Sequence, residues 1–525
     1  MTPVSSAAPG TAPSAGDNAA AYLLQRRLDA GEGDRVAIRC QGRDHTYAAL
    51  SARVEAAAAA LLRDGVRAEE RLLILLPDSP EWVVAFLGAL RAGVVAVPVS
   101  TMLTAADLAF LAADSRARAA VVDRRFAATA QGLALSPRLH RMVVAGEAGP
   151  APAERDGLVV EAWEEWIGRP TPGAPAAATT ADETAFWLYT SGTTGSPKGA
   201  MHRHADVPFV CSSYGGEVLG ITREDRTFSV ARLFFAYGLG NAMLFPFSAG
   251  ATSVLDPRPP TPATVVETLR AERPTLFFAT PTFFAALLAA EVPREVFASV
   301  RHCVSAGETL PEAVYERFLD RTGVQIVDGI GSTEALHIFL SNRPGQPRAG
   351  TTGTVVPGYG LRLVDDEGAE VDDGTDGHLL VRGESLCTGY WNRTAVNRRT
   401  FLGDWMRTGD VFVRDAAGAY TYRGRSDDML KSGGIWVSPA EIEGVLVQHP
   451  EVLEAAVVGA RDPEDGVERP VAHVVRMPGS ELTEDALVAF VRERLAPFKR
   501  PRRVLFAADL PKTATGKIQR YRLRG

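Results

Sequence analysis

Apolar residues recur along the chain with two periods, one that is typical of helices and one that is typical of strands. Helix-like segments rich in alanine and leucine alternate with short apolar runs. Such alternation indicates an α/β fold in which helices cover largely parallel sheets. In the first part of the chain we expect helices over residues 48–64, 80–92 and 104–115, and strands over 71–76, 93–99, 119–122 and 185–188.

A second alternating region follows a connection rich in proline, alanine and glycine, residues 149–180, with a short amphipathic piece at 163–167. From residue 353 to 383 the pattern changes to short strands separated by Asp/Gly turns, which indicates a small β-barrel-like region. Between these two stretches we expect strands over 276–280, 300–305 and 324–327, and helices over 281–290 and 311–321.

The end of the chain has the length and pattern of a separate, small α/β domain, with helices over 439–448 and 483–495 and strands over 452–458 and 471–476. The polar, glycine-containing segment 422–428 before it is a candidate hinge. We therefore expect a disordered tail over residues 1–17, a large N-terminal domain over 18–426 and a small mobile C-terminal domain over 427–525.

Composition narrows the class of protein. A chain of 525 residues exceeds one ordinary core, and 46% hydrophobic with 23% charged residues is typical of a soluble globular protein. A net charge of −7 argues against a general nucleic-acid binder, and no apolar run is long enough to span a membrane. The N-terminal stretch lacks the regions of a signal peptide, and four widely separated cysteines favour a reducing cytoplasm.

A loop of glycine, serine and threonine is the strongest local signal. Residues 189–199 read Y-T-S-G-T-T-G-S-P-K-G and follow the apolar strand expected at 185–188. Glycines leave the backbone N–H groups accessible, and hydroxyls and Lys198 add donors, so the loop suits a polyphosphate. It is not a Walker A loop, because Gly-Lys-Ser/Thr does not occur. A flexible surface loop is the alternative.

Three further motifs carry chemistry. Residues 328–334, D-G-I-G-S-T-E, follow an expected strand and can hold Mg²⁺ bridged to phosphate, unless Thr333 simply caps a helix. Asp410 after a glycine, with Arg425 downstream, can bind a ribose diol, unless the pair Gly-Asp is only a turn. Residues 512–517, K-T-A-T-G-K, offer a mobile cation, unless they belong to a solvated basic tail with the arginines that follow.

In this order, the motifs resemble the adenylate-forming superfamily of acyl-CoA synthetases, adenylation domains and luciferases, over nearly the whole chain after the tail. The resemblance implies two half-reactions. A carboxylate and MgATP first give an acyl-adenylate and pyrophosphate, and a thiol then displaces AMP. The cofactors it implies are ATP, Mg²⁺ and either CoA or an acyl carrier protein that bears phosphopantetheine.

The resemblance also assigns roles residue by residue. The ATP loop comprises Thr190, Ser191, Gly192, Thr193, Thr194, Gly195 and Lys198, with its hydroxyls and Lys198 at the β- and γ-phosphates. Gly307, Glu308, Asp328 and Gly329 frame adenine, with Asp328 near its exocyclic amine, while Asp410 and Arg425 hold the ribose. The catalytic residues are Thr333 at the α-phosphate, Glu334 as the Mg²⁺ ligand, and Lys517.

Lys517 is expected to contact the carboxylate and the α-phosphate in the first step, where a positioned cation lowers the barrier to in-line attack. For the second step the family rotates its C-terminal domain about a hinge, which corresponds to Asp427. The loop from Lys431 to Pro439, with Gly433 and Gly434, then forms the thiol tunnel.

Within the superfamily the closest resemblance is to benzoate–CoA ligases, through residues 234–241, 305–308, 336–342 and 513–520. Amino-acid-activating relatives carry an aspartate where this chain has Ala236, so an amino-acid substrate is disfavoured. The aryl-acid pocket is expected to comprise Phe235, Ala236, Tyr237, Ala306, Gly331, His337 and Ile338. The alternative is that Tyr237 and His337 are ordinary packed residues.

The thiol acceptor stays open at this level. The basic run 499–503 suits the phosphates of CoA, the acidic helix of an acyl carrier protein, or plain solvent. A catalytically idle relative that binds a nucleotide is a further alternative, but Lys198, Glu334, Asp410 and Lys517 together argue against it. We expect a small aromatic acid as substrate, no nucleic-acid or membrane partner, and a monomer or homodimer.

Overall fold

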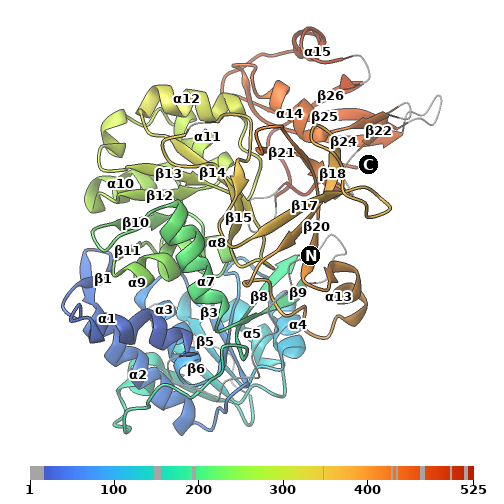
Figure 1. The fold of residues 1–525 in the computed structure, drawn as a ribbon. Helices are drawn as coiled ribbons and strands as arrows, with labels where there is room; N and C mark the ends of the chain where they lie inside the picture. Colours follow the sequence, from blue (N-terminus) through green and yellow to red (C-terminus); the bar gives the residue numbers. More distant parts are fainter. Residues whose placement is uncertain are drawn as a thin grey trace. The chain divides into compact units, whose positions relative to one another are not determined.

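The computed structural model describes residues 17–146, 155–191, 197–346, 348–426, 430–432, 435–461, 468–496, 499–512 and 518–524 (Figure 1). The chain divides into two compact units, which are described one after the other. The first unit comprises Met1–Pro259, Thr333–His337 and Glu384–Asn397, and the second comprises Pro260–Ser332, Ile338–Gly383 and Arg398–Gly525.

A seven-stranded sheet forms the core of the first unit, in the order β7-β6-β5-β3-β4-β8-β9. Its strands pair in parallel except for β8 and β9, which form an antiparallel hairpin at one edge. The strands are β3 (Arg71–Leu75), β4 (Val95–Pro98), β5 (Ala119–Asp123), β6 (Arg141–Ala145), β7 (Val159–Ala162), β8 (Thr184–Ser191) and β9 (Pro197–Arg203).

Three helices of this unit, α2, α3 and α4, begin at residues whose side chains accept the first backbone N–H groups. Thr46 accepts from Ala49, Ser79 precedes Pro80 of α3, and Thr104 forms a capping box with Asp107. Every residue of α3 except Glu81 is buried, so this helix lies within the core. The helices are α1 (Arg26–Asp29), α2 (Tyr47–Arg63), α3 (Pro80–Arg91), α4 (Ala105–Ser115), α5 (Ala127–Ala134), α6 (Trp163–Gly168), α7 (Asp206–Val210), α8 (Ala236–Leu239) and α9 (Phe245–Ala249).

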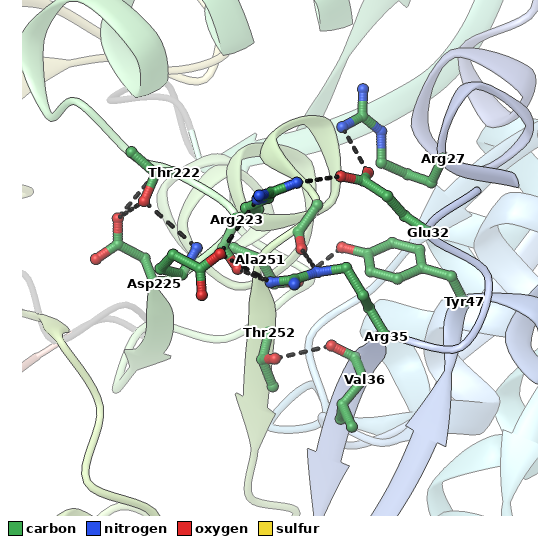
Figure 2. A network of polar contacts seen from close by, with 12 residues as sticks. Arg27, Glu32, Arg35, Val36, Tyr47, Thr222, Arg223, Asp225, Ala251 and Thr252 are labelled. Carbon is green, nitrogen blue, oxygen red and sulfur yellow. Dashed lines mark hydrogen bonds and ion pairs between the residues drawn. The ribbon is translucent and has the colours of Figure 1, made fainter. Parts of the chain in front are cut away.

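Four further strands of the first unit lie in the order β10-β11-β1-β2, with bounds β1 (Val36–Cys40), β2 (Arg43–Thr46), β10 (Arg226–Ser229) and β11 (Thr252–Leu255). Polar contacts reinforce this pairing (Figure 2). The hydroxyl of Thr252 donates to the carbonyl of Val36 at 2.8 Å, and that of Tyr47 donates to the carbonyl of Ala251 at 2.6 Å. The N-terminal segment is thereby fixed to residues far along the chain.

The second unit contains a mixed sheet in which β12, β13 and β14 run parallel and β15 and β16 follow antiparallel. Phe284 of α11 makes edge-to-face contacts with Phe277 of β12 and with Phe318 of α12. The elements are α10 (Pro262–Glu272), β12 (Leu276–Ala279), α11 (Pro281–Ala289), β13 (His302–Ser305), α12 (Glu312–Thr322), β14 (Ile326–Gly331), β15 (Ile338–Ser341) and β16 (Thr354–Val355).

A five-stranded antiparallel sheet follows, in the order β17-β18-β20-β19 with β21 paired to β20. It extends the β-rich region beyond the expected residue 383, and β21 takes in part of the segment expected to be a hinge. The strands are β17 (Gly360–Val364), β18 (Asp376–Arg382), β19 (Phe401–Leu402), β20 (Trp405–Arg414) and β21 (Tyr420–Arg425), and α13 (Thr394–Thr400) precedes β19.

Residues 430–524 form the C-terminal lobe, which carries its own apolar core. Helices α14 and α15 cover a sheet in the order β24-β25-β26, and β22 and β23 form a hairpin. The elements are β22 (Leu430–Ser432), β23 (Ile435–Val437), α14 (Pro439–Leu446), β24 (Val452–Arg461), β25 (Glu468–Arg476), α15 (Glu484–Arg492) and β26 (Arg503–Ala507).

The α/β fold expected from the sequence is confirmed, with helices and strands close to their expected positions. The expected tail over residues 1–17 lies outside the described residues except for Asp17. In the described part of the chain, no helix combines the length and hydropathy needed to cross a bilayer.

Candidate active site

The two ends of the phosphate-loop motif lie on the paired strands β8 and β9. Thr190 and Ser191 end β8, and Lys198 lies in β9 directly opposite Thr190. The strand expected at 185–188 is therefore longer than expected, because its pairing continues to Ser191, opposite Pro197. Gly192, Thr193, Thr194 and Gly195 lie outside the described residues.

Asp114, at the end of α4, joins the two strands of this hairpin. Its carboxylate accepts the hydroxyl of Tyr189 at 2.8 Å and Nη2 of Arg393 at 2.9 Å. The same Arg393 nitrogen donates to the carbonyl of Pro197 at 3.4 Å. Burial, and then the charge of Asp114, raise the pKa of Tyr189, so its hydroxyl remains a donor. Thr190 and Lys198 therefore sit on strands that share one anchor.

Lys198 and Glu334 approach the same tyrosine. The Lys198 ammonium lies 5.0 Å from the centre of the Tyr390 ring, and the Tyr390 hydroxyl donates to Oε1 of Glu334 at 2.6 Å. An ionised carboxylate has about four acceptor positions, so this one hydrogen bond leaves Glu334 able to bind a metal ion. A cation suited to phosphate and a carboxylate suited to Mg²⁺ thus contact the same side chain, Tyr390.

A buried histidine holds the backbone of Thr333. Nε2 of His202 lies 2.8 Å from the Thr333 carbonyl, and Nδ1 lies 3.0 Å from Oδ2 of Asp206. The side chains of His202 and Asp206 are fully buried, and Arg203 donates to Asp206 through its backbone N–H and Nε. Residues 333–337 form bends and turns before β15 and no helix begins there, so the capping alternative is wrong.

The expected adenine-binding residues lie in the second unit, around β13 and β14. Asp328, Gly329 and Gly331 lie inside β14, which extends further than the expected strand. Burial raises the pKa of the Asp328 carboxyl to about 8, against the smaller effects of Ser305 and the Gly329 backbone N–H. Gly329 has to be glycine, because a Cβ would lie 2.9 Å from the side chain of Ile338.

Gly307 and Glu308 follow β13 and approach the start of α11. Gly307 has φ +96°, a left-handed conformation that favours glycine. Glu308 accepts hydrogen bonds from the backbone N–H of Thr282 at 3.1 Å and from its hydroxyl at 2.6 Å. A carboxylate is favoured at this position, because the N-terminus of a helix carries a partial positive charge.

Asp410 and Arg425, the residues expected at the ribose, form an ion pair. They are register partners on β20 and β21, and Nη1 of Arg425 donates to Oδ1 of Asp410 at 2.9 Å. Thr408, Gly409 and Asp410 form an irregularity inside β20 rather than a turn between elements, and Gly409 has φ +77°. The carboxylate thereby keeps a second oxygen that could accept a diol.

The first unit contributes part of the expected aryl-acid pocket. Ala236 and Tyr237 begin α8, and Nε2 of His337 lies 3.3 Å from the Tyr237 carbonyl and 3.1 Å from Oδ1 of Asn241. Burial lowers the pKa of His337 to about 3, so the ring is neutral and carries its hydrogen on Nε2. Its ring packs against aromatic neighbours, with Phe245 at 4.5 Å between ring centres.

The remaining pocket residues differ in where they lie. Phe235 precedes α8 and packs edge-to-face against Phe234 at 4.6 Å. Ala306 and Ile338 are buried in the second unit, where Gly331 and Ile338 are register partners on β14 and β15. The backbone of Lys431 lies in β22. Gly433, Gly434, Asp427 and Lys517 lie outside the described residues.

Two family models match the chain: the AMP-binding enzyme over residues 24–391 and the AMP-binding enzyme C-terminal domain over residues 441–517. The chain belongs to the AMP-binding enzyme family. The resemblance to the adenylate-forming superfamily is thereby confirmed.

The relatives of this AMP-binding enzyme span almost its whole length. Benzoate–CoA ligase of Thauera aromatica is 45% identical over 97% of this chain and 95% of its own. The crystal structure of a benzoate CoA ligase from Burkholderia xenovorans LB400 is 43% identical and has a TM-score of 0.89, covering 97% of this chain and 100% of that one. The crystal structure of the anthranilate CoA ligase AuaEII in complex with anthranoyl-AMP is 39% identical, with a TM-score of 0.90 and 96% of each chain covered.

Four residues that contact the candidate site in this AMP-binding enzyme, namely Asp114, His202, Tyr390 and Arg393, were not found from the sequence. None belongs to a motif, and each acts on a residue far along the chain. His202 alone has a usable signal. It lies an even number of positions after Lys198, so reading residues 197–203 as a strand would place both side chains on one face.

Asp328→Asn tests the effect of burial on the Asp328 carboxyl. Since the native pKa is about 8 and the unfolded value is near 4, the native state binds more protons between these values. Wild-type stability should therefore fall, relative to the variant, by up to about 1.4 kcal/mol per pH unit as pH rises from 5 to 7. Urea unfolding at several pH values measures this. Glu367→Gln, an exposed control, should show no such trend.

His202→Phe tests the buried link to Thr333. Phenylalanine keeps the stacking on Phe186 but removes the donor to the Thr333 carbonyl, which should lower the unfolding free energy by about 1–3 kcal/mol. Calorimetric titration should also show weaker MgATP binding. His140→Phe, at an exposed position, is the matched control. Unchanged MgATP affinity in His202→Phe would contradict a link between this histidine and the nucleotide site.

Proposed function

We propose that this chain is an ATP-dependent, AMP-forming acid–thiol ligase that converts benzoate or a close analogue into its CoA thioester. The observation that carries the proposal is the 45% identity to a benzoate–CoA ligase over nearly the full length of both chains. The close structural likeness to a second benzoate CoA ligase supports the same conclusion.

In the first half-reaction a carboxylate oxygen of the acid attacks the α-phosphorus of ATP, and the bond to pyrophosphate breaks. Lys198 and the hydroxyls of the hairpin hold the β- and γ-phosphates, and Thr333 contacts the α-phosphate. Bound Mg²⁺ neutralises phosphate charge, and Glu334 is suited to hold it. Because His202 and Tyr390 hold Thr333 and Glu334, these groups need little rearrangement during attack.

The nucleoside is bound by residues of the second unit. Asp410 accepts the ribose hydroxyls with the oxygen that Arg425 leaves available, while Gly307, Glu308, Asp328 and Gly329 frame the adenine. Asp328 is protonated over much of the neutral range, which suits a site for an uncharged base. An ionised buried carboxylate without a cation partner would be costly there.

The acid is an uncharged ring with one carboxylate. Ala236 offers no partner for a substrate amine, and His337 is neutral because of burial. Together with Phe235, Tyr237, Ala306, Gly331 and Ile338, these residues favour an aryl group over an amino acid. The hydrogen-bonded ring of His337 is held on one edge, which limits how the pocket can adapt to ring substituents.

In the second half-reaction the thiol sulfur attacks the acyl carbon of the adenylate, the C–O bond to AMP breaks, and the thiol proton is lost. For this step we propose rotation of the domain formed by residues 427–525 relative to residues 18–426, about a hinge at Asp427. Lys517 then leaves, and the segment with Lys431, Gly433 and Gly434 approaches to form the thiol tunnel.

CoA is the acceptor we favour, and an acyl carrier protein is the second candidate. In the basic run 499–503, Lys499 forms an ion pair with Glu441 at 2.6 Å, and Arg500 donates to the carbonyls of Arg492 and Leu495. These two residues are bonded within their own lobe, which reduces the positive charge available to an acidic partner helix. A cytoplasmic location and a monomeric or homodimeric state remain predictions.

Benzoate should support ATP–pyrophosphate exchange by the purified enzyme, whereas fatty acids should not, because the pocket residues favour a planar ring. A second experiment tests the thiol acceptor. The enzyme is given benzoyl-adenylate with either free CoA or a holo carrier protein, and kcat/KM is compared for the two acceptors. We expect CoA to be the better acceptor. Exchange with fatty acids but not with benzoate would contradict the aryl-acid assignment.

Lys517→Ala should separate the two half-reactions. Loss of the cation should lower the rate of adenylate formation by about 10²–10³-fold, since charge develops on the α-phosphate only in that step. Transfer from supplied benzoyl-adenylate to CoA should continue at about the wild-type rate. An equal loss in both assays, measured by rapid quench, would be inconsistent with the proposed rotation.

A further inference from the structure

Residues 512 and 518 lie on either side of the segment 513–517, which contains Lys517, and form an antiparallel bridge with each other. The backbone N–H of Gln519 donates to the carbonyl of Pro511 at 2.7 Å, which extends this pairing by one residue. The described residues next to Lys517 in the chain are thus held together by backbone contacts.

An ion pair joins Arg520, on the C-terminal side of this segment, to Glu443 of α14. Arg520 donates to both oxygens of Glu443, with Nη2 at 2.9 Å from Oε1 and 2.8 Å from Oε2. Both side chains are mostly buried, with 25% and 14% exposed. Oε1 of Glu443 also accepts the backbone N–H of Val457 at 2.7 Å, so this carboxylate of α14 contacts both β24 and Arg520.

A second ion pair joins Lys512, on the N-terminal side of the segment, to Glu454 of β24. Nζ of Lys512 lies 2.9 Å from Oε2 of Glu454 and 2.9 Å from Oδ1 of Asp509. Apolar contacts supplement these charges, because Leu510 and Ile518 pack in one small cluster with Ala456 and Val475 of the same sheet. The alternative of a solvated basic tail is thus wrong for Lys512 and Arg520.

We propose that the ion pairs Arg520–Glu443 and Lys512–Glu454 are positioning elements of the adenylation half-reaction, because they anchor to α14 and β24 the residues on either side of Lys517 in the chain. The inference rests on the proposed function, in which Lys517 acts on the first step alone. It follows that weakening either pair slows adenylate formation and spares thioester formation. A purely structural role in the lobe would affect both steps.

The test measures both half-reactions in Arg520→Ala and Glu443→Gln. We expect adenylate formation from benzoate to slow by about 10- to 100-fold, since small misplacements of a catalytic group have effects of this size. Transfer from supplied benzoyl-adenylate to CoA should keep about the wild-type rate. Glu441→Gln is the matched control, because Glu441 lies on the same helix and pairs with a lysine away from this segment. It should leave both rates unchanged.

A charge exchange separates loss of the ion pair from loss of stability. The double exchange Arg520→Glu with Glu443→Arg restores opposite charges and should recover part of the adenylation rate. Equal losses in both half-reactions, or full adenylation by Glu443→Gln and Arg520→Ala in folded protein, would overturn the inference. A wild-type enzyme that exchanged pyrophosphate with no aryl acid would refute the proposed function itself, and this inference with it.

Discussion

The antiparallel register of β8 and β9 is the constraint on which the candidate site of the first unit depends. It places Thr190 opposite Lys198 and puts His202 on the same face of β9 as Lys198. From that face, His202 holds the carbonyl of Thr333, while Lys198 lies over the tyrosine that holds Glu334. A slip of one residue would turn every one of these side chains to the opposite face. The carboxylate of Asp114 opposes such a slip because it is linked to both strands.

Burial shifts the pKa values of two titratable side chains in the candidate site so that both favour their neutral forms. It raises the pKa of an acid, Asp328, and lowers that of a base, His337, so both groups become neutral near pH 7. These are the residues expected at the adenine and at the aryl ring, both of which are uncharged. Lys198 and Glu334, expected at phosphate and metal, are only partly buried.

The parts predicted correctly from the sequence are those that local chemistry determines. The helices expected over 80–92 and 104–115 are observed as α3 and α4, and the side chains of Ser79 and Thr104 accept nearby N–H groups where these helices begin. The residues that were missed depend on contacts between distant segments. Arg393 reaches Asp114 across 279 positions and His202 reaches Thr333 across 131, and no local pattern encodes such pairs.

The contacts of the C-terminal lobe bear on how the proposed rotation can be achieved. The ion pairs of Glu441, Glu443 and Glu454 all join residues within the lobe, so a rigid rotation would leave them intact. The bond from the Ser438 hydroxyl to the Arg423 carbonyl is different, because it joins the lobe to β21. Under the proposed rotation this bond must break or re-form, whereas the ion pairs of Lys512 and Arg520 move with the lobe. The free-energy difference between the two orientations then depends on the contact of Ser438 with Arg423 and on the bound nucleotide, rather than on these ion pairs.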